Sequence, residues 1–523
     1  MGTMTLLAVP IAQTRVENAL VAVESASRQG ADIVELRMDY LEDLSSECLG
    51  RLILAGKRVG KLILVTCRDQ MEGGYRPIEQ SIRREILTLA LRQGADFIDC
   101  EFRNFQQYEV GKPILEEWQR HPSARLILSA HNFQGPFEDP AGLVNSILAG
   151  CPRAIPKIAY TARHINDCFA ALDLAGEYPS AIVIAMGPAG QITRILAPKF
   201  GSPLTYACLD TDSTTAPGQM GLSQFRDYRW NSIRSDTRVY GIIGNPVAHS
   251  MSPILFNTLF DAEQMNAVYV PILMEGGYSE FSDFLNGLRS RQGTYGRDFH
   301  GFSVTIPHKS NALEYLLRQG GSVEPLASRI GAVNTLRIGY GELTAGNNTD
   351  YAGAIDALAQ VLGTDRHGLH GKSVAVLGAG GAARAVVAGL CDVGAKVTIY
   401  NRTQEKGRLL AEEFHCRFAG LLPSTQVPDE IVINCTSIGM YPNVNDMPVS
   451  PDNFRSGMVV FDTVYNPLDT RLLKEARSAG AIPIRGIEMF IRQALAQFWL
   501  FTGRQANEEI VRECVIRSLS KTQ

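Results

Sequence analysis

Eight short apolar segments, each followed by enough chain for a helix, constrain the fold of the N-terminal half more than any other feature. They are LLAVPI (6–11), DIVELRMD (32–39), KLILVTCR (61–68), DFIDCEF (96–102), RLILSAH (125–131), PKIAY (156–160), AIVIAMG (181–187) and LTYACL (204–209). Apolar runs of this length that alternate with helix-length segments are typical of βαβ units with buried parallel strands. Eight successive units predict a closed (β/α)₈ barrel. An open doubly wound sheet is the alternative, although it rarely repeats the unit so evenly.

The rest of the chain follows another pattern, which begins after the polar run RDYRWNSIRSDTR (226–238). We interpret this run as a connection between domains. Further strand candidates are VYGIIGNP (239–246), AVYVPIL (267–273), FSVTIP (302–307), SVAVLG (373–378), KVTIYNRT (396–403), EIVINCTS (430–437), MVVFDTVY (458–465) and AIPIRG (481–486). The amphipathic stretch 486–503 predicts a helix bounded by glycines. A chain of 523 residues is too long for one core, so the sequence predicts two or three α/β domains.

Composition argues against several classes of partner. The formal net charge is −4 and no block of Lys and Arg stands out, so we expect neither nucleic acid nor an anionic membrane surface as partner. The ten cysteines include no CxxC pair, which indicates a reducing compartment rather than a disulfide framework or a zinc site. No apolar run reaches membrane-spanning length, and MGTMTLLAVPIAQ (1–13) lacks the features of a signal or transit peptide. We expect a soluble, cytoplasmic protein without a bound metal.

The run GAGGAA (378–383) predicts a dinucleotide site. It follows an apolar strand and precedes an Ala-rich helix, which is the context that such a loop requires. Gly378 permits the tight turn, and Gly380 lets the backbone approach a pyrophosphate, to which the helix N-terminus offers N–H groups and positive potential. Ala383 takes the third glycine position. An ordinary turn is the alternative reading, and the strand–loop–helix context favours cofactor binding.

The next strand ends in Asn401, Arg402 and Thr403, with Lys406 one turn later. A site for NAD usually has an acidic residue here, which holds the ribose 2′-OH. A guanidinium group and a hydroxyl suit a 2′-phosphate instead. The predicted cofactor is therefore NADP, and the alternative is a solvated arginine at the end of a strand.

Nine motifs in one order resemble the shikimate dehydrogenases over roughly residues 238–523. They are GNPVAHSMSP (244–253), GFSVTIPHK (301–309), GAVNTL (331–336), GNNTDY (346–351), GAGGAARA (378–385), NRT (401–403), NCTSIGM (434–440), DTVYNP (462–467) and GIEMFIRQA (486–494). The resemblance implies an α/β substrate domain (236–345, completed by 486–523) and a Rossmann NADP domain (346–485). Many bacterial members have Asn at the position of Ser303. The serine of this chain resembles the plant enzymes.

A ketone that receives hydride needs a proton donor at the developing alkoxide. By the resemblance, Lys309 and Asp350 form this acid–base pair. The other positions that it implies are Ser250, Ser252, Thr305, Asn334, Tyr465 and Gln493 for the substrate, and Gly378, Ala379, Gly380, Gly381, Ala382, Asn401, Arg402, Thr403, Thr436 and Gly486 for the cofactor. The residues alone also allow plainer roles, such as a surface charge for Lys309, a helix N-cap for Asp350 and backbone caps for the serines.

Functional groups of a (β/α)₈ barrel gather at the C-terminal ends of its strands. Those positions hold Glu35, Arg37, Asp39, Arg68, Glu72, His131, Lys157, Arg194 and Gln219. Three arginines that face a lysine repel it unless an anion, such as a substrate carboxylate, joins them. A cationic and apolar setting lowers the pKa of Lys157, which leaves a free amine to form a Schiff base, with His131 as the proton-moving base. The alternatives are a lysine that reaches solvent and a structural histidine.

Shorter pieces of the same half resemble type I 3-dehydroquinate dehydratases, and we place this domain at residues 1–228. They are VELRMDY (34–40), TCRDQMEGG (66–74), SAHNF (129–133), KIA (157–159), GQITR (190–194) and APGQ (216–219). The resemblance implies that Lys157 forms the Schiff base, His131 moves protons and Glu72 orients His131. It also implies a set of residues that position the substrate: Glu35, Arg37, Arg68, Arg194, Thr215 and Gln219. Thr215 and Tyr206 replace the commoner Ser and Phe.

Together the two resemblances predict a two-reaction enzyme of the shikimate pathway, similar to the plant fusion. The barrel would convert 3-dehydroquinate to 3-dehydroshikimate, and the second half would reduce that ketone with NADPH to shikimate. Three alternatives stay open: one degenerate half, a quinate dehydrogenase, and a non-catalytic sensor of the pathway. Retention of Ser252 and Thr305 resembles users of shikimate more than users of quinate.

Overall fold

The structure is a computed structural model that describes residues 4–210, 214–248, 250–339, 345–422 and 424–520. The chain divides into two compact units: unit 1 comprises Met1–Ala248 and Gln264–Phe299, and unit 2 comprises His249–Glu263 and His300–Gln523. The domain boundaries given above remain predictions. Within the described ranges, no helix is both long and apolar enough to cross a membrane.

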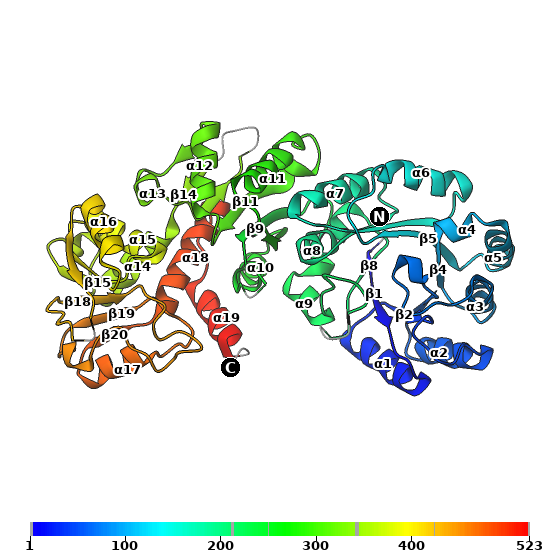
Figure 1. Ribbon diagram of the computed structural model, residues 1–523, viewed down its shortest axis with the longest axis horizontal. Helices are drawn as coiled ribbons and strands as arrows, with labels where there is room; N and C mark the ends of the chain where they lie inside the picture. Colours follow the sequence, from blue (N-terminus) through cyan, green and yellow to red (C-terminus); the bar gives the residue numbers. More distant parts are fainter. Residues whose placement is uncertain (1–3, 211–213, 249, 340–344, 423, 521–523) are drawn as a thin grey trace. The chain divides into compact units, whose positions relative to one another are not determined.

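Eight parallel strands form the core of unit 1. They are β1 (Leu6–Ile11), β2 (Ile33–Arg37), β3 (Leu62–Thr66), β4 (Phe97–Glu101), β5 (Arg125–Asn132), β6 (Ile155–Thr161), β7 (Ile182–Met186) and β8 (Leu204–Tyr206). Their order is β7-β6-β5-β4-β3-β2-β1-β8, so the last strand pairs with the first. The sheet therefore curls into a nearly closed barrel, which confirms the predicted fold class (Figure 1).

Helices connect these strands on the outside of the barrel: α1 (Val16–Gln29), α2 (Ser46–Arg58), α3 (Gln80–Arg92), α4 (Phe102–Phe105), α5 (Tyr108–Arg120), α6 (Pro140–Gly150), α7 (Cys168–Glu177) and α8 (Gln191–Ile195); α9 (Leu222–Asp227) follows the last strand. Helix α2 illustrates why they form. Ser45 caps it by accepting a hydrogen bond from the Cys48 N–H at 3.2 Å. A Cβ on Gly56 would lie 2.1 Å from Ile63 Cδ1 of β3, so glycine lets the helix pack closely against the strand.

The inside of the barrel holds both apolar and charged side chains. All eight strands contribute to one apolar cluster, which includes Ile33, Leu64, Ile127 and Ala159. Because side chains alternate along a strand, Lys157 points to the same side of β6 as Ala159. The lysine that the sequence singles out therefore faces the barrel interior.

The predicted connection 226–238 packs against the barrel. Its short 3₁₀ turn η6 (Trp230–Ser232) buries Trp230, whose Nε1 donates to the Arg194 carbonyl at 3.3 Å. Lys199 donates to the carbonyls of Ser235 and Thr237 at 2.6 and 3.0 Å. This run is therefore fixed to the barrel by specific contacts, although its polar composition suggested a plain connection.

The second sheet has the order β10-β9-β11-β13-β14-β12. Its strands are β9 (Arg238–Gly244), β10 (Ala267–Leu273), β11 (Phe299–Val304), β12 (Ser322–Val323), β13 (Thr335–Arg337) and β14 (Ala345–Asn347). The helices of this region are α10 (Ser252–Ala262), α11 (Tyr278–Ser290), α12 (Lys309–Gln319) and α13 (Pro325–Ile330), and the 3₁₀ turn η7 (Tyr295–Asp298) precedes β11. Strand β13 pairs antiparallel with both β11 and β14.

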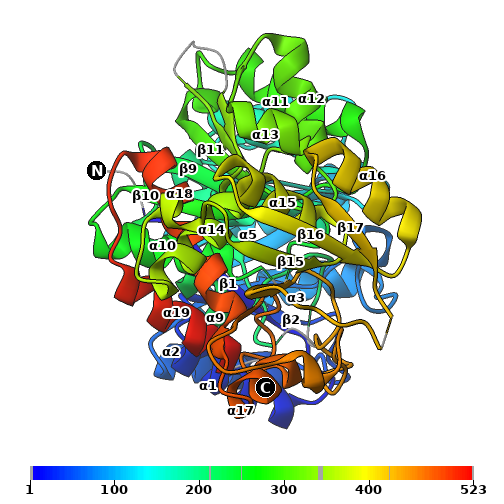
Figure 2. The same cartoon turned by 90° about the vertical axis from the view of Figure 1, so that its left-hand side faces the viewer.

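The third sheet is parallel throughout and lies in unit 2. Its strands are β15 (Ser373–Leu377), β16 (Lys396–Asn401), β17 (Arg417–Gly420), β18 (Ile431–Asn434), β19 (Val459–Asp462) and β20 (Ile482–Ile484), in the order β17-β16-β15-β18-β19-β20. The remaining helices are α14 (Thr349–Val361), α15 (Gly381–Asp392), α16 (Gln404–Phe414), α17 (Arg471–Ser478), α18 (Gly486–Thr502) and α19 (Glu508–Ser520). Figure 2 shows β15, β16 and β17 side by side, with α15 and α16 against them. The strand order reverses at β15, which is where doubly wound sheets bind ligands, and the predicted Rossmann fold is confirmed.

Two candidate active sites

Lys157 lies on β6 and is buried, with 5% of its surface exposed. Its Nζ donates to Asp99 Oδ2 of β4 at 2.8 Å and to the Tyr206 hydroxyl of β8 at 3.0 Å. Burial and the charge of Arg68 lower the pKa of Lys157 below its ordinary value, although Asp99 acts in the opposite direction. The neighbouring sequence offers no acidic partner, but the barrel supplies one from another strand.

His131, at the end of β5, is held by Glu72. The Glu72 carboxylate lies 3.0 Å from His131 Nδ1 and accepts the His131 backbone N–H at the same distance. Burial and the charges of Arg68 and Lys157 hold the pKa of His131 well below its usual range, and burial raises the pKa of Glu72 to about 7. The imidazole is therefore neutral at neutral pH. A Nδ1 proton donated to Glu72 leaves Nε2 as an acceptor.

The three arginines of this site differ in their partners. Arg37 forms two hydrogen bonds with Asp39, at 2.7 and 2.9 Å. Arg68 pairs with Asp99 at 2.8 Å and with Glu101 at 2.9 Å. These carboxylates of the protein neutralise both guanidinium groups, so the predicted need for a joining anion applies to Arg194 alone.

Arg194 has no carboxylate partner among the described residues. It is 2% exposed, its Nη1 makes one long hydrogen bond of 3.4 Å to the Tyr206 carbonyl, and its Nε has no hydrogen-bond partner. Burial lowers its pKa to about 10, so it remains charged at neutral pH. A buried and unpaired cation is costly, which indicates a site for an anion.

One cavity brings the predicted barrel residues together. It is lined by Glu35, Arg37, Arg68, Glu72, His131, Lys157, Arg194, Tyr206, Thr215 and Gln219. Thr215 and Gln219 also bond each other, at 2.8 Å between the Thr215 N–H and Gln219 Oε1. The sequence reasoning missed Asp99, Glu101 and Ser129, although DFIDCEF and RLILSAH place them at the same strand ends.

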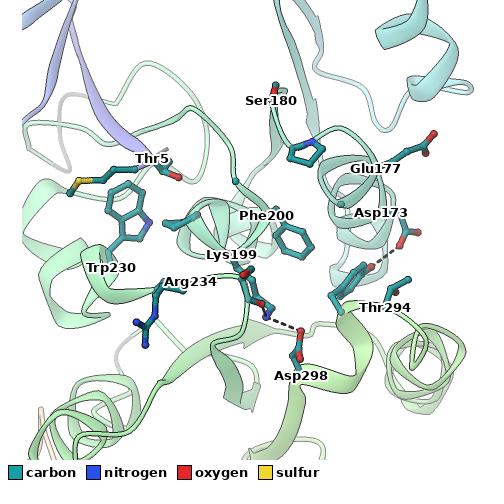
Figure 3. A pocket seen from close by; sticks show the side chains of 18 of the residues that line it. Thr5, Asp173, Glu177, Ser180, Lys199, Phe200, Trp230, Arg234, Thr294 and Asp298 are labelled. Atoms are coloured by element: carbon teal, nitrogen blue, oxygen red, sulfur yellow. Dashed lines mark hydrogen bonds and ion pairs between the residues drawn. The ribbon is translucent and has the colours of Figure 1, made fainter. Parts of the chain in front are cut away.

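A larger cavity of about 1100 Å³ in unit 1 lies away from these residues. Figure 3 shows its wall, with Thr5, Ser180 and Phe200 from the N-terminal side of the barrel strands. The buried charge in its wall already has a partner: Lys199 pairs with Asp298 at 2.8 Å, and the Tyr295 hydroxyl donates to Asp173 at 2.8 Å. The Lys199 ammonium is therefore not left for a ligand, and we assign no chemistry to this cavity.

The second candidate site lies in unit 2 and centres on an ion pair. Lys309, the first residue of α12, places its Nζ 2.5 Å from Asp350 Oδ2 in the first turn of α14. The cap of α14 is Asn348, whose side chain accepts the Asp350 N–H at 3.0 Å, so Asp350 itself is free of the capping role. Both charged groups are partly exposed, which leaves them accessible to a substrate.

Asn334 holds the other carboxylate oxygen of Asp350, the one that Lys309 does not contact. Its Nδ2 donates to Asp350 Oδ1 at 2.9 Å, and its Oδ1 accepts the Thr349 N–H at 2.8 Å. The buried Gln497, which the sequence reasoning missed, accepts from the Ser303 hydroxyl at 2.8 Å and donates to the Asn334 carbonyl at 3.2 Å. Ser303, where many bacterial members have Asn, therefore contacts the acid–base pair only indirectly, through Gln497 and Asn334.

The other predicted substrate residues of unit 2 are half-buried or exposed. The Ser250 hydroxyl accepts the Ser252 N–H at 3.2 Å, which keeps the backbone-cap alternative open for it. Thr305 follows β11, and Tyr465 follows β19 with its ring 5.6 Å from that of Phe490. Gln493 lies on α18, which packs closely against α14 at Gly353. Their roles toward a substrate remain proposals.

The loop after β15 fits a dinucleotide. Gly378 adopts φ +113°, which favours glycine, and a Cβ there would lie 3.1 Å from Thr436 Cγ2. A Cβ on Gly380 or Gly381 would meet nothing within 4 Å, so the backbone at the start of α15 is open to a ligand. At the end of β16, Asn401 Nδ2 donates to the Thr403 carbonyl at 2.7 Å, while Arg402 and Thr403 are exposed. The residues present therefore fit NADP.

The remaining predicted cofactor positions lie either in the glycine loop and α15 or just after other strands of the third sheet. Ala379 and Ala382 belong to the loop and the first turn of α15. Thr436 donates to Asn434 Oδ1 at 2.7 Å after β18. Gly486 begins α18, where a Cβ would lie 2.5 Å from the Val464 carbonyl oxygen, so its close packing against the backbone also explains the glycine.

A parallel barrel with a buried lysine and a second part with a Rossmann sheet define a fused α/β enzyme. Four family models match in order: Type I 3-dehydroquinase (7–231), Shikimate dehydrogenase substrate binding domain (242–336), Shikimate / quinate 5-dehydrogenase (360–441) and Shikimate 5′-dehydrogenase C-terminal domain (486–515). The chain is 38% identical over 525 aligned residues to the Bifunctional 3-dehydroquinate dehydratase/shikimate dehydrogenase, chloroplastic, of Arabidopsis thaliana, covering 97% of this chain and 83% of the relative. It belongs to the family of bifunctional 3-dehydroquinate dehydratase/shikimate dehydrogenases, as the motifs predicted.

Two further comparisons cover different shares of the chain. The Shikimate dehydrogenase (NADP(+)) of Methanothermobacter thermautotrophicus is 38% identical over 299 residues, which is 55% of this chain and 99% of that protein. Among solved structures, a shikimate dehydrogenase in complex with NADP⁺ matches with a TM-score of 0.49 and 36% identity, covering 55% of this chain and 97% of its own.

Proposed function

We propose that this chain catalyses two successive reactions, the dehydration of 3-dehydroquinate in unit 1 and the NADPH-dependent reduction of 3-dehydroshikimate to shikimate in unit 2. The observation that carries the proposal is Lys157, a buried amine of lowered pKa in the cavity that holds His131. A non-catalytic sensor has no need of a buried lysine of lowered pKa beside a neutral histidine. The acid–base pair in the second site extends the argument to the other half.

In the barrel, the free amine of Lys157 attacks the substrate ketone, and loss of water gives an imine. The protonated imine draws electrons from the adjacent carbon, which makes the hydrogen on that carbon acidic. His131 Nε2 takes this proton, and the hydroxyl group on the next carbon leaves with a proton as water. Hydrolysis of the imine returns the product ketone and the Lys157 amine. Glu72 keeps the His131 ring in the orientation that this transfer needs.

The charges of the cavity suit the substrate. Arg194 offers a bidentate donor to the substrate carboxylate. Glu35, Arg37, Thr215 and Gln219 line the same cavity and offer polar groups to the ring hydroxyls. Asp99 and Tyr206 hold the Lys157 amine in place before the attack.

In unit 2, the loop after β15 would hold NADPH, which would supply a hydride to the ketone carbon. Lys309 donates the proton that the developing alkoxide oxygen requires. Asp350 orients the Lys309 ammonium, and Asn334 orients Asp350. The loop at Gly378–Gly381 would hold the pyrophosphate at the N-terminus of α15, and Arg402 with Thr403 would hold the 2′-phosphate. Ser250, Ser252, Thr305, Tyr465 and Gln493 are the candidates for the carboxylate and hydroxyls of the substrate.

The compartment is proposed from cysteine chemistry. All ten cysteines are free thiols, which suits the reducing cytoplasm. The plant relative is named chloroplastic. Fractionation with an antibody against the chain tests this placement.

A single assay tests both reactions. 3-Dehydroquinate and NADPH are mixed with the intact chain, and the absorbance of NADPH is expected to fall because the first product feeds the second site. Lys157→Ala should abolish the signal with 3-dehydroquinate and preserve it with 3-dehydroshikimate, whereas Lys309→Ala should abolish both. Borohydride added with 3-dehydroquinate should attach mass at Lys157. A Lys157→Ala variant with wild-type dehydratase turnover would refute the Schiff base.

The quinate alternative needs its own measurement. Ser252 and Thr305 are both present, which supports shikimate as the preferred substrate. The kcat/KM values for shikimate and quinate oxidation with NADP⁺ are compared on the same preparation. A higher value for quinate would overturn the preference while it leaves the dehydrogenase reaction in place.

A further inference from the structure

A buried arginine on the outer helix α3 is linked by hydrogen bonds to both Lys157 and His131 of the dehydratase site. We call these two series of hydrogen bonds the two arms of the network. Arg83 is 7% exposed and contacts two carboxylates: Nη1 donates to Glu101 Oε2 and Nη2 donates to Asp69 Oδ2, each at 2.9 Å. Asn104 donates to both of these carboxylates, at 3.1 and 2.9 Å. Neither resemblance nor the mechanism above uses Arg83.

The first arm leads from Arg83 to Lys157. Glu101 Oε1 accepts from Arg68 Nη1 at 2.9 Å, and Arg68 Nη2 donates to Asp99 Oδ2 at 2.8 Å. The same Asp99 oxygen accepts from Lys157 Nζ at 2.8 Å. Each step is a charge-assisted hydrogen bond between buried side chains, so displacement of Glu101 is transmitted to the amine.

The second arm leads from Arg83 to His131. Asp69 caps the short 3₁₀ turn η1 (Gln70–Glu72) by accepting the Met71 N–H at 2.9 Å. Glu72 is the last residue of that turn and holds His131. A second bond, from the Asp69 N–H to Glu101 Oε1 at 3.0 Å, joins the two arms close to Arg83.

The charges of this network balance. Asp69, Asp99 and Glu101 supply three negative charges, and Arg68, Arg83 and Lys157 supply three positive charges when the lysine is protonated. The thiols of Cys67 and Cys100 lie beside the network, and burial raises their pKa, so both stay neutral. Lys157 itself faces the charged or titratable groups of the surrounding strands: Glu35, Arg68, Asp99, His131 and Tyr206.

We propose that Arg83 is a positioning residue of the dehydratase, which holds Lys157 and the Glu72–His131 pair in register and limits the net negative charge around Lys157, so that a free amine can form. Loss of its positive charge leaves one buried carboxylate in excess. That excess stabilises the ammonium form of Lys157, so the pH at which the amine becomes free rises. The inference rests on the proposed dehydratase activity.

The test is the pH profile of kcat/KM for Arg83→Met, measured on the intact chain between pH 6 and 9, because this quantity reports titrations of the free enzyme. The acidic limb should move upward by about one pH unit, with roughly tenfold lower kcat/KM at pH 6.5 and partial recovery at pH 9. Arg83→Lys restores the charge and should return the limb toward wild type. Arg84→Met, a half-buried neighbour on the same helix whose Nη1 donates to the Glu109 carbonyl at 3.2 Å, should leave the acidic limb unchanged. Dehydrogenase turnover with 3-dehydroshikimate reports on the fold of the remainder.

The outcomes separate the two claims. A wild-type chain without dehydratase turnover refutes the proposed function itself. A working wild type with an Arg83→Met profile that coincides with it overturns the positioning role. A uniform loss of kcat/KM at every pH also overturns it, because a general structural defect does not move a titration.

Discussion

We expect replacement of Arg194 to raise the stability of the fold and to weaken substrate binding. Among the residues that the structure describes, no carboxylate pairs with its buried guanidinium, and its pKa is lowered from 12.5 to about 10. The lowered pKa corresponds to a penalty of about 3 kcal/mol for keeping the charge in the folded protein at neutral pH. Arg194→Met keeps much of the side-chain volume and removes that charge.

The variant should therefore be more stable than the wild type. We expect a gain of about 1–3 kcal/mol after the lost packing of the guanidinium is allowed for, which raises the Tm of the barrel transition by about 2–8 °C. Substrate binding should suffer, because two charge-assisted hydrogen bonds to a carboxylate are lost. At about 1.5 kcal/mol each, KM for 3-dehydroquinate rises by about 100-fold or more.

Calorimetry and dehydratase kinetics on the intact chain measure both effects. Arg28→Met, an exposed arginine at the end of α1, is the matched control and should leave both quantities unchanged. A lower Tm in Arg194→Met would show that the arginine supports the fold instead of waiting for an anion. An unchanged KM would show that the substrate carboxylate binds elsewhere.

Three other perturbations test separate features. Burial raises the pKa of Glu72 from 4.5 to about 7, so this group favours the folded state at low pH. That contribution of up to about 3 kcal/mol is lost as pH rises through 7. The urea midpoint of the wild type should therefore fall between pH 5 and pH 8, and the fall should be smaller in Glu72→Gln. Arg402→Ser should raise KM for NADPH by about tenfold while KM for NADH stays constant, and an equal change for both would contradict a 2′-phosphate contact. Gly486→Ala places a Cβ 2.5 Å from the Val464 carbonyl oxygen and should lower the Tm of unit 2, whereas Gly150→Ala, with nothing within 4 Å, should not.

The strands and the fold class were predictable from the sequence because apolar runs record burial directly. The eight barrel segments and five of the six parallel strands of the third sheet lie where the runs indicated, whereas β17 (Arg417–Gly420) was not predicted. The predicted residues at strand ends also meet in one cavity, except Asp39, which pairs with Arg37 behind it, since the ends of parallel strands converge at one side of a barrel.

The partners of those residues were not predictable, because they come from other strands and helices. Asp99 pairs with Lys157 across β4, β5 and β6, a relation that no local pattern contains. Arg83 is one of two adjacent arginines on α3, and only the packing of the helix shows that Arg83 is buried and Arg84 is not. Gln497 lies on a helix whose sequence resembles an ordinary amphipathic stretch, and its buried amide is revealed by its bonds to Ser303 and Thr335.

The anchoring of residues 264–299 within unit 1 determines how this gene can be divided. Asp173 of α7 accepts from Arg291 at 2.7 Å, and Phe169 stacks on Phe284 at 5.6 Å between ring centres. The cationic Lys199 depends on Asp298 and on the carbonyl of Thr237. A barrel expressed as residues 1–236 would expose the phenyl ring and leave a nearly buried ammonium without its counter-charge. Dissection of the two activities is therefore better done by inactivating one lysine at a time than by cutting the polypeptide.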